Sequence, residues 1–296
     1  MYRFLVFLTL IALTLTACGG QPVSDSGTPV PVILTSTTIL ADITRNITGD
    51  RLKVDSLLPV GTDPHSYQPT PQDVAKLAKS KLLIVNGAGY EQFLTPLLEN
   101  TGGERTILEA SSGVSLRKEA GSMDPHMWLD PNNVIRYVEN IRDGLIRFDP
   151  AGEAVYKSKA DYYLRQLVDL NTWIDEQMRK IPPEKRLLVT NHEALGYFAQ
   201  RYGFTVVGTI VESFSSDASP SAQQMAGLID QIKASGAPAI FLDAVDTSSL
   251  AQQIADETGV RVVTDLHLES LTDGAPAGTY IDLMKYNVTQ IVNALK

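Results

Sequence analysis

The sequence predicts an α/β protein of two lobes, each built on a mostly parallel sheet, with one long helix joining them. Three observations indicate this fold. Short apolar runs rich in branched residues recur along the chain, helical patterns separate them, and one apolar stripe at helical spacing crosses the middle. Strands that alternate with helices are the sequence pattern of α/β domains.

The apolar runs are predicted to be strands because they are short and continuous. Apolar residues at every position are typical of parallel strands that are covered on both faces. The expected strands are 32–36, 82–85, 187–190, 206–208, 239–242 and 260–263. Helical patterns at 73–79 and 221–235 precede two of these strands, and a third at 248–258 ends at Gly259, a common helix terminator.

The segment 150–181 is predicted to be a single helix that links the lobes. Pro150 suits a first helical turn, and two prolines follow residue 181. Apolar residues between them recur at spacings of three and four, which places them on one face: Ala160, Tyr163, Leu164, Leu167, Leu170, Trp173, Ile174, Met178 and Ile181. We expect a rigid spine between an N-terminal lobe at 32–149 and a C-terminal lobe at 182–296; a dimerisation helix is the alternative.

The first 31 residues are typical of a secretion signal and a tether. Arg3 precedes the apolar run 4–15, which is too short to span a bilayer but suits a signal peptide. The run ends in LTAC, which resembles a bacterial lipobox with cleavage before Cys18 and a lipid on its sulfur. We expect removal of 1–17 and a flexible tether at 18–31. An ordinary signal peptide with an incidental cysteine is the alternative.

Charge and motifs exclude several classes of function. The 296-residue chain has a formal net charge of −9 and no cluster of Lys and Arg, which argues against nucleic-acid binding. Its single cysteine allows no intramolecular disulfide. The sequence contains no Walker A and no GxSxG motif, and the glycine turn at 87–89 lacks the third glycine of a dinucleotide fingerprint.

Three of the four histidines lie where a binding site is expected. His65 and His126 each follow Asp-Pro, and the proline stiffens both loops. His192 comes just after an apolar strand, and open α/β sheets bind ligands beyond the carboxyl ends of their strands. Neutral imidazoles are good zinc ligands, so we predict a metal site that the tertiary fold assembles. Three surface or capping histidines are the alternative.

A carboxylate often completes such a site. Asp265 is the first candidate because it directly follows the strand expected to end in Val262-Val263-Thr264. Other acidic candidates near strand ends are Glu193, Asp243 and Asp246, and His267 is a reserve ligand. Since ligating histidines usually donate their other N–H to an acceptor, three further carboxylates are expected to brace the loops: Asp63, Asp124 and Asp130.

Together these features resemble the zinc- and manganese-binding solute receptors of bacterial ABC importers, the adhesin-like metal-binding lipoproteins. The resemblance covers nearly the whole mature chain. Its carriers are GTDPH at 61–65 with YQPTPQD at 67–73, DPHMWLDP at 124–131, HEALGYFA at 192–199 with RYG at 201–203, and IADETGV at 254–260. The resemblance implies two α/β lobes joined by one long helix, with the metal in the cleft between the lobes.

By position, the resemblance implies that His65 and His126 are ligands from the N-terminal lobe, with His192 third and Asp265 fourth. Zinc-type members have His at the third place, where typical manganese-type members have Glu. Two departures stand out. Residues 102–123 contain no His where many zinc receptors carry a His-rich acidic loop, and Asp243 occupies a position where many members show Glu.

We therefore expect a monomeric receptor without enzymatic activity, anchored outside the cell membrane by a lipid on Cys18. It would capture Zn²⁺ and deliver it to an ABC permease. The first alternative is a manganese receptor of the same family. The second is a zinc hydrolase with Glu193 as its base, which an open fourth coordination position would favour. The third is a surface adhesin with a structural metal.

Overall fold

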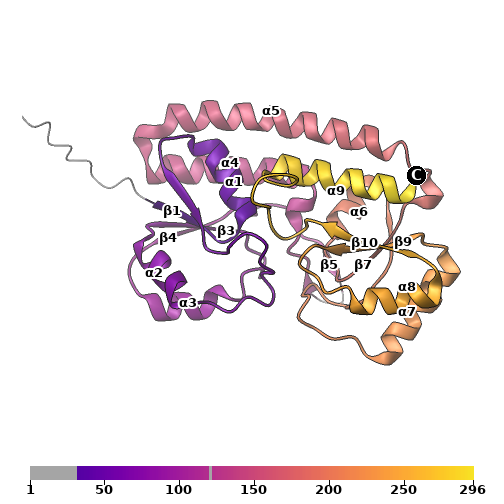
Figure 1. The fold of residues 1–296 in the computed structure, drawn as a ribbon. Helices are drawn as coiled ribbons and strands as arrows, with labels where there is room; N and C mark the ends of the chain where they lie inside the picture. The colour runs from indigo at the N-terminus through magenta and orange to yellow at the C-terminus, as the bar shows by residue number, and fades with distance from the viewer. Residues whose placement is uncertain (1–31, 120–121) are drawn as a thin grey trace, which may run out of the picture. The chain divides into compact units, whose positions relative to one another are not determined.

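A computed structural model describes residues 32–119 and 122–296. The expected signal peptide, Cys18 and the tether lie outside the described residues. Two four-stranded sheets dominate the fold, and every strand pair within them is parallel (Figure 1). Among the described residues, no helix is both long and apolar enough to cross a membrane. The predicted α/β class with two parallel sheets is confirmed.

The N-terminal lobe is built on the sheet β2-β1-β3-β4. Its strands are β1 (Val32–Thr35), β2 (Lys53–Ser56), β3 (Leu82–Val85) and β4 (Thr106–Glu109). Its helices are α1 (Thr38–Thr48), α2 (Pro71–Lys79), α3 (Leu94–Thr101) and α4 (Pro131–Phe148). A short antiparallel pair, β5 (Lys118–Glu119) and β6 (Ser122–Met123), precedes the loop that carries His126.

The C-terminal lobe repeats this plan with the sheet β10-β9-β7-β8. Its strands are β7 (Leu187–Thr190), β8 (Thr205–Thr209), β9 (Ala239–Asp243) and β10 (Arg261–Leu266). Its helices are α6 (Gly196–Tyr202), α7 (Ala222–Ser235), α8 (Ser249–Thr258) and α9 (Tyr280–Leu295). Strand β10 continues to Leu266, so Asp265, which was expected to follow the strand, lies within it.

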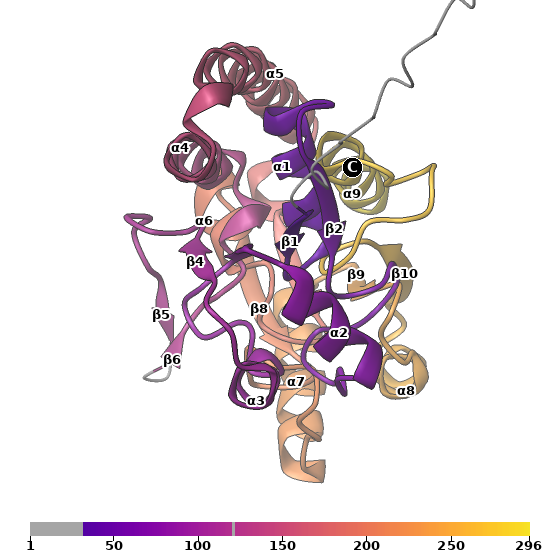
Figure 2. The same ribbon diagram turned by 90° about the vertical axis from the view of Figure 1, so that its left-hand side faces the viewer.

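One uninterrupted helix, α5 (Glu153–Met178), links the lobes as predicted. It starts later than expected because 150–152 form a 3₁₀ turn, and it ends three residues before 181. Its apolar face is buried through Tyr156, Ala160, Tyr163, Leu167, Leu170, Ile174 and Met178. It packs against α1 and α4 of the N-terminal lobe and against α9 of the C-terminal lobe (Figure 2). The helix therefore contacts both lobes.

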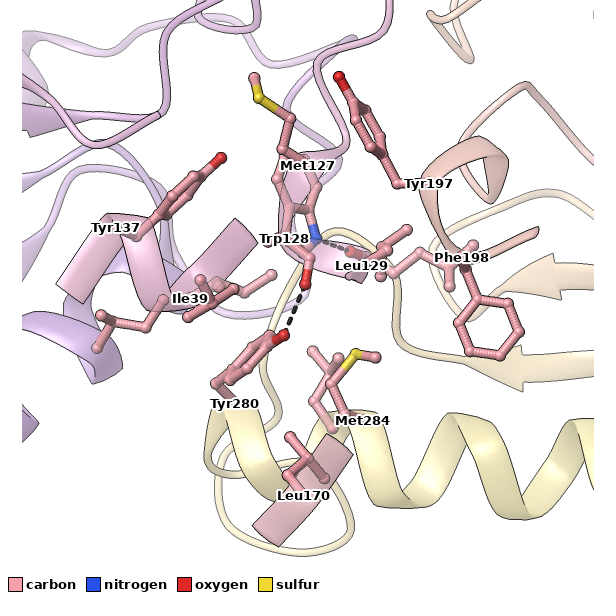
Figure 3. Close-up of a cluster of buried hydrophobic side chains, with 14 of the residues drawn as sticks. Ile39, Met127, Trp128, Leu129, Tyr137, Leu170, Tyr197, Phe198, Tyr280 and Met284 are labelled. Atoms are coloured by element: carbon pink, nitrogen blue, oxygen red, sulfur yellow. Dashed lines mark hydrogen bonds between the residues drawn. The ribbon is translucent and has the colours of Figure 1, made fainter. Parts of the chain in front are cut away.

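A shared hydrophobic core continues from one lobe to the other around Trp128. Figure 3 shows this ring among side chains of α4, α5, α6 and α9, including Tyr137, Leu170 and Phe198. The Trp128 indole N–H donates to the Leu268 carbonyl at 2.8 Å, and the Trp128 carbonyl accepts from the Tyr280 hydroxyl at 2.7 Å. A continuous core of this kind resists independent motion of the two lobes, because opening it would expose apolar surface to water.

Candidate metal centre

Four side chains from separate loops converge on one point. Each of His65, His126, His192 and Glu269 offers a donor atom, and these atoms lie within 4.8 Å of one another. All four side chains are removed from solvent, with exposed fractions of 7% for His65, 0% for His126, 2% for His192 and 1% for Glu269. Buried imidazoles and a carboxylate at this spacing are a donor set for a transition-metal ion.

The spacing of the donor atoms suits a single ion. Oε1 of Glu269 lies 3.2 Å from Nε2 of His126, 3.3 Å from Nε2 of His192 and 3.8 Å from Nε2 of His65. Ligands bound tetrahedrally at ~2.0–2.1 Å lie ~3.3 Å from each other. Within the described chain, Nε2 of His65 and Nε2 of His126 are buried without a well-formed hydrogen bond. A bound cation would satisfy both nitrogens, which are otherwise costly to bury.

Backbone and carboxylate contacts fix the loop of His65. Oδ1 of Asp63 accepts from the backbone N–H of His65 at 2.9 Å. Its Oδ2 accepts from the hydroxyls of Ser66 at 3.0 Å and Ser216 at 2.6 Å. Ser216 belongs to the C-terminal lobe, so Asp63 connects the His65 loop to the opposite side of the site. The expected bracing role of Asp63 agrees with this geometry.

Asp124 orients the ring of His126. Its Oδ1 accepts from the backbone N–H of His126 at 3.0 Å and lies 3.0 Å from Nδ1 of the same residue. Its Oδ2 lies 3.3 Å from Nε of Arg117. An acceptor at Nδ1 leaves Nε2 as the metal-facing nitrogen. Asp130, the third expected bracing residue, instead caps α4 by accepting from the backbone N–H of Asn132 at 2.9 Å.

The cluster shifts the pKa values of its own members. Burial of the His126 ring alone would lower its pKa, but the charge of Glu269 and the hydrogen bond to Asp124 outweigh it and raise that pKa to about 9. Burial alone would raise the pKa of Glu269, but the facing histidines, His126 foremost, hold it well below its usual value. Without metal, the site therefore stores a proton on His126 beside an ionised Glu269.

Three contacts hold the loop of Glu269 in place. Oδ2 of Asp243 accepts from the backbone N–H groups of Leu268 at 2.6 Å and Glu269 at 2.9 Å. The Trp128 indole N–H holds the Leu268 carbonyl, as described above. The Tyr90 hydroxyl donates to Oε2 of Glu269 at 2.7 Å. Burial, and then the charge of Glu269, raise the pKa of Tyr90 well above its usual value, so this hydroxyl remains a donor.

The structure does not bring Asp265 to the histidines, and the expectation that it is the fourth ligand does not fit. Asp265 is still within β10, and its Oδ2 accepts from the Tyr286 hydroxyl at 2.5 Å and lies 3.3 Å from Nε2 of Gln290. Both partners belong to α9, away from the cluster. Glu269 was not among the expected ligands because the strand was expected to end before Asp265, whereas β10 ends at Leu266. The acidic residue in the loop beyond Leu266 is the signal that points to it.

The remaining candidates lie outside the four-residue cluster. Asp246 accepts from Asn191 Nδ2 at 2.7 Å and from the backbone N–H of Asp243 at 2.9 Å. Burial, and then the charge of Glu269, raise the pKa of Asp243 to about 7. The ring of His267, the reserve ligand, lies against Tyr286 with ring centroids 5.4 Å apart. Glu193 lines a separate cavity of about 660 Å³ next to Asp124 and Phe204.

Comparisons with known proteins agree with this fold and identify a family. The family model "Zinc-uptake complex component A periplasmic" (ZnuA) matches residues 33–294. The manganese-binding lipoprotein MntA of Halalkalibacterium halodurans is 34% identical over 297 residues, which cover 99% of this chain and 98% of the relative. The Mn-bound periplasmic metal-binding protein of Candidatus Liberibacter asiaticus has a TM-score of 0.80 and 30% identity, covering 90% of this chain and 100% of that one.

A second similar structure is that of a protein named for zinc. The periplasmic zinc-binding protein TroA of Treponema pallidum has a TM-score of 0.83 and 27% identity, covering 90% of this chain and 99% of that one. Proteins similar to this chain are thus named for both metals, with manganese the more frequent among the curated relatives. The expected preference for Zn²⁺ over Mn²⁺ is not confirmed by them.

The family match also decides between receptor and enzyme. It spans nearly the whole described chain, and the relatives align over almost their full lengths. Members of the family are solute-binding receptors and not enzymes, which excludes a zinc hydrolase with Glu193 as its base. The chain belongs to the ZnuA family and is a metal-binding receptor component of an ABC transporter.

Proposed function

We propose that the chain captures one divalent transition-metal ion through His65, His126, His192 and Glu269 and delivers it to an ABC permease. The observation that carries the proposal is the buried convergence of three imidazoles on one carboxylate oxygen. Four protein donors fill a tetrahedral shell, whereas catalytic zinc keeps a position open for water. Such a closed shell suits capture and transport of an ion.

We propose Mn²⁺ as the ion that the transporter imports. The support is the set of relatives named for manganese, among them MntA at 34% identity. On this support we rank the manganese alternative ahead of zinc. Zn²⁺ is the second candidate, and the observation that favours it is the donor set itself, since three nitrogens and one carboxylate suit tetrahedral zinc.

The metal that the isolated receptor binds most tightly need not be the metal that the transporter imports. Divalent zinc binds a given nitrogen site more tightly than manganese, while selection in the cell depends also on geometry and metal availability. We therefore expect the isolated receptor to bind Zn²⁺ more tightly than Mn²⁺, even where the transporter supplies the cell with manganese.

We further propose that the receptor is a monomer held on the outer side of the cell membrane by a lipid on Cys18. The lipobox-like run before Cys18 and the lipoprotein names of the relatives support the anchor. The tether at 18–31 would let the receptor move between free solution near the membrane and the permease.

Metal titration and uptake test the proposal together. The mature protein, stripped by chelation, should take up one Zn²⁺ or one Mn²⁺, and His192→Ala should abolish this at micromolar metal. His267→Ala is the matched control. It should bind metal as the wild type does, because the ring of His267 lies against Tyr286 of α9. Cells lacking the receptor should lose uptake of radioactive manganese. Loss of zinc uptake alone would reassign the cargo, and a wild type that binds neither metal would refute the receptor.

A further inference from the structure

The two oxygens of Glu269 have different partners. Oε1 faces the three histidine nitrogens at 3.2–3.8 Å. Oε2 accepts the hydrogen bond of Tyr90 at 2.7 Å. Glu269 therefore presents one oxygen to the ion-binding point, and the other is engaged outside it.

Packing fixes Tyr90 in this position. The side chain is 3% exposed, and its ring lies edge-on to Trp128 and His65, with centroid distances of 4.9 Å and 5.5 Å. Its backbone N–H donates to the Gly87 carbonyl at 3.1 Å, in the turn that follows β3. A buried ring held on two sides and by its backbone has little freedom to move the hydroxyl away.

The loop of Glu269 is equally constrained. Oδ2 of Asp243 accepts from the backbone N–H of Glu269. The Trp128 indole N–H, which Figure 3 shows in a hydrogen bond, donates to the carbonyl of Leu268. Because these hydrogen bonds hold the backbone in place, a second oxygen would reach the ion if the carboxylate turned and broke its hydrogen bond to Tyr90. Hydrogen bonds to a charged acceptor are stronger than those between neutral groups, so this turn is opposed.

We propose that Tyr90 is a specificity-determining residue. Its hydrogen bond keeps Glu269 bound to the metal through one oxygen only, and so favours a coordination shell of four donors over a larger shell. The inference rests on the proposed capture of metal by these four residues. Zinc is commonly bound by four donors, whereas manganese prefers more oxygen ligands and a higher coordination number. Tyr90 thus lowers the affinity of the site for Mn²⁺ relative to its affinity for Zn²⁺.

Tyr90→Phe tests this role while preserving the ring. The variant frees Oε2 of Glu269, and the ratio of Mn²⁺ to Zn²⁺ affinity should rise about tenfold, the scale of one charge-assisted hydrogen bond. Tyr67→Phe is the matched control in the same lobe, because the Tyr67 hydroxyl donates to Asp73 at 2.6 Å and not to a ligand. Its ratio should equal that of the wild type.

X-ray absorption supplies a readout that a packing role would not change. The zinc-loaded wild type should show four nitrogen or oxygen donors at about 2.0 Å, and manganese-loaded Tyr90→Phe should gain an oxygen relative to the manganese-loaded wild type. Equal loss of both affinities in Tyr90→Phe with an unchanged shell would overturn the proposal, as would a two-oxygen Glu269 in the zinc-loaded wild type. A wild type that binds no metal would instead refute the receptor itself.

Discussion

Asp124 contacts His126 twice, through the backbone N–H at 3.0 Å and through Nδ1 of the ring at 3.0 Å. One carboxylate oxygen thus sets both the position of the residue and the direction of its free nitrogen. Asp124→Asn should weaken metal binding about 10- to 100-fold, the usual effect of removing such an outer partner. Competition against a chromophoric chelator measures the change.

Asp130→Asn is the matched control for Asp124→Asn. Asp130 lies in the same loop, but it caps α4 and makes no contact with a ligand in the described structure. The control should cost at most about 1 kcal/mol of stability, as weakened helix caps do, and leave affinity within twofold of wild type. Equal loss of affinity in both variants would mean that the loop as a whole matters, and not the orientation of the His126 ring.

Replacement of each candidate carboxylate decides which one is the ligand. Glu269→Ala removes the oxygen that faces all three histidines, and we expect affinity to fall by about 100-fold or more. Asp265→Ala removes only the hydrogen bonds to Tyr286 and Gln290, so it should cost about 1 kcal/mol of stability and leave affinity nearly unchanged. Isothermal titration of both variants checks this, and the reverse pattern would restore Asp265 as the ligand.

Local patterns predicted those parts of the fold and site that depend on neighbouring residues. The stripe on α5 predicted a buried face because its residues recur at helical spacing, and His65 and His126 stood out in their Asp-Pro-His loops. Glu269 could not be predicted as the ligand in this way. Its identification depends on the residue at which β10 ends and on which acidic side chain is hydrogen-bonded to α9 instead. Asp265 pairs with Tyr286, a contact between segments that no periodicity encodes.

The two edge strands of the N-terminal sheet were missed for a related reason, whereas β8 and β10, the edges of the C-terminal sheet, were predicted. β2 and β4 lie at the two edges of the N-terminal sheet, and each begins and ends with a polar or charged residue that interrupts the apolar pattern. The central strand β3 is buried throughout and was predicted at its correct bounds. Sequence patterns report burial, so the polar and charged residues within β2 and β4 weaken the strand signal there.

Truncation on the buried face of α5 should destabilise the protein as a whole. Leu167 is fully buried in the shared core, so Leu167→Ala should lower the free energy of unfolding by about 2–5 kcal/mol. Val168 is its neighbour on the same helix but 53% exposed, and Val168→Ala should change stability by less than about 0.5 kcal/mol. Urea unfolding followed by fluorescence measures both. Two separate transitions in Leu167→Ala would show that α5 does not couple the lobes.

The anchor makes a prediction outside the described residues. Cys18 is the single cysteine of the chain, so its replacement removes the one possible site of thioether lipidation. Cys18→Ala should appear in the soluble extracytoplasmic fraction or accumulate unprocessed, whereas Ser24→Ala in the tether should remain with the membrane. A Cys18→Ala protein that is processed normally and still sediments with membranes would mean that something other than a lipid on Cys18 holds it.

Metal binding should depend on pH well above the range of a free histidine. The pKa of His126 is raised to about 9 in the metal-free site, so His126 carries a proton at neutral pH that an incoming ion must displace. Affinity should therefore rise with pH by up to about tenfold per unit until pH reaches about 9, with about one proton released per ion near pH 7. Calorimetry in buffers of different ionisation enthalpy counts this proton.

Stability without metal should change with pH in the opposite direction. The folded-state pKa of His126, about 9, exceeds the unfolded value near 6.5, so its attraction to Glu269 stabilises the metal-free protein fully below about pH 6.5. That contribution is lost as pH rises through about 9, while affinity for metal increases over the same interval. Denaturant titrations of the metal-free protein across this range, paired with the binding data, measure both trends. Affinity that stays flat between about pH 6.5 and 9 would mean that His126 is already neutral in the metal-free site and that the charge of Glu269 does not hold a proton there.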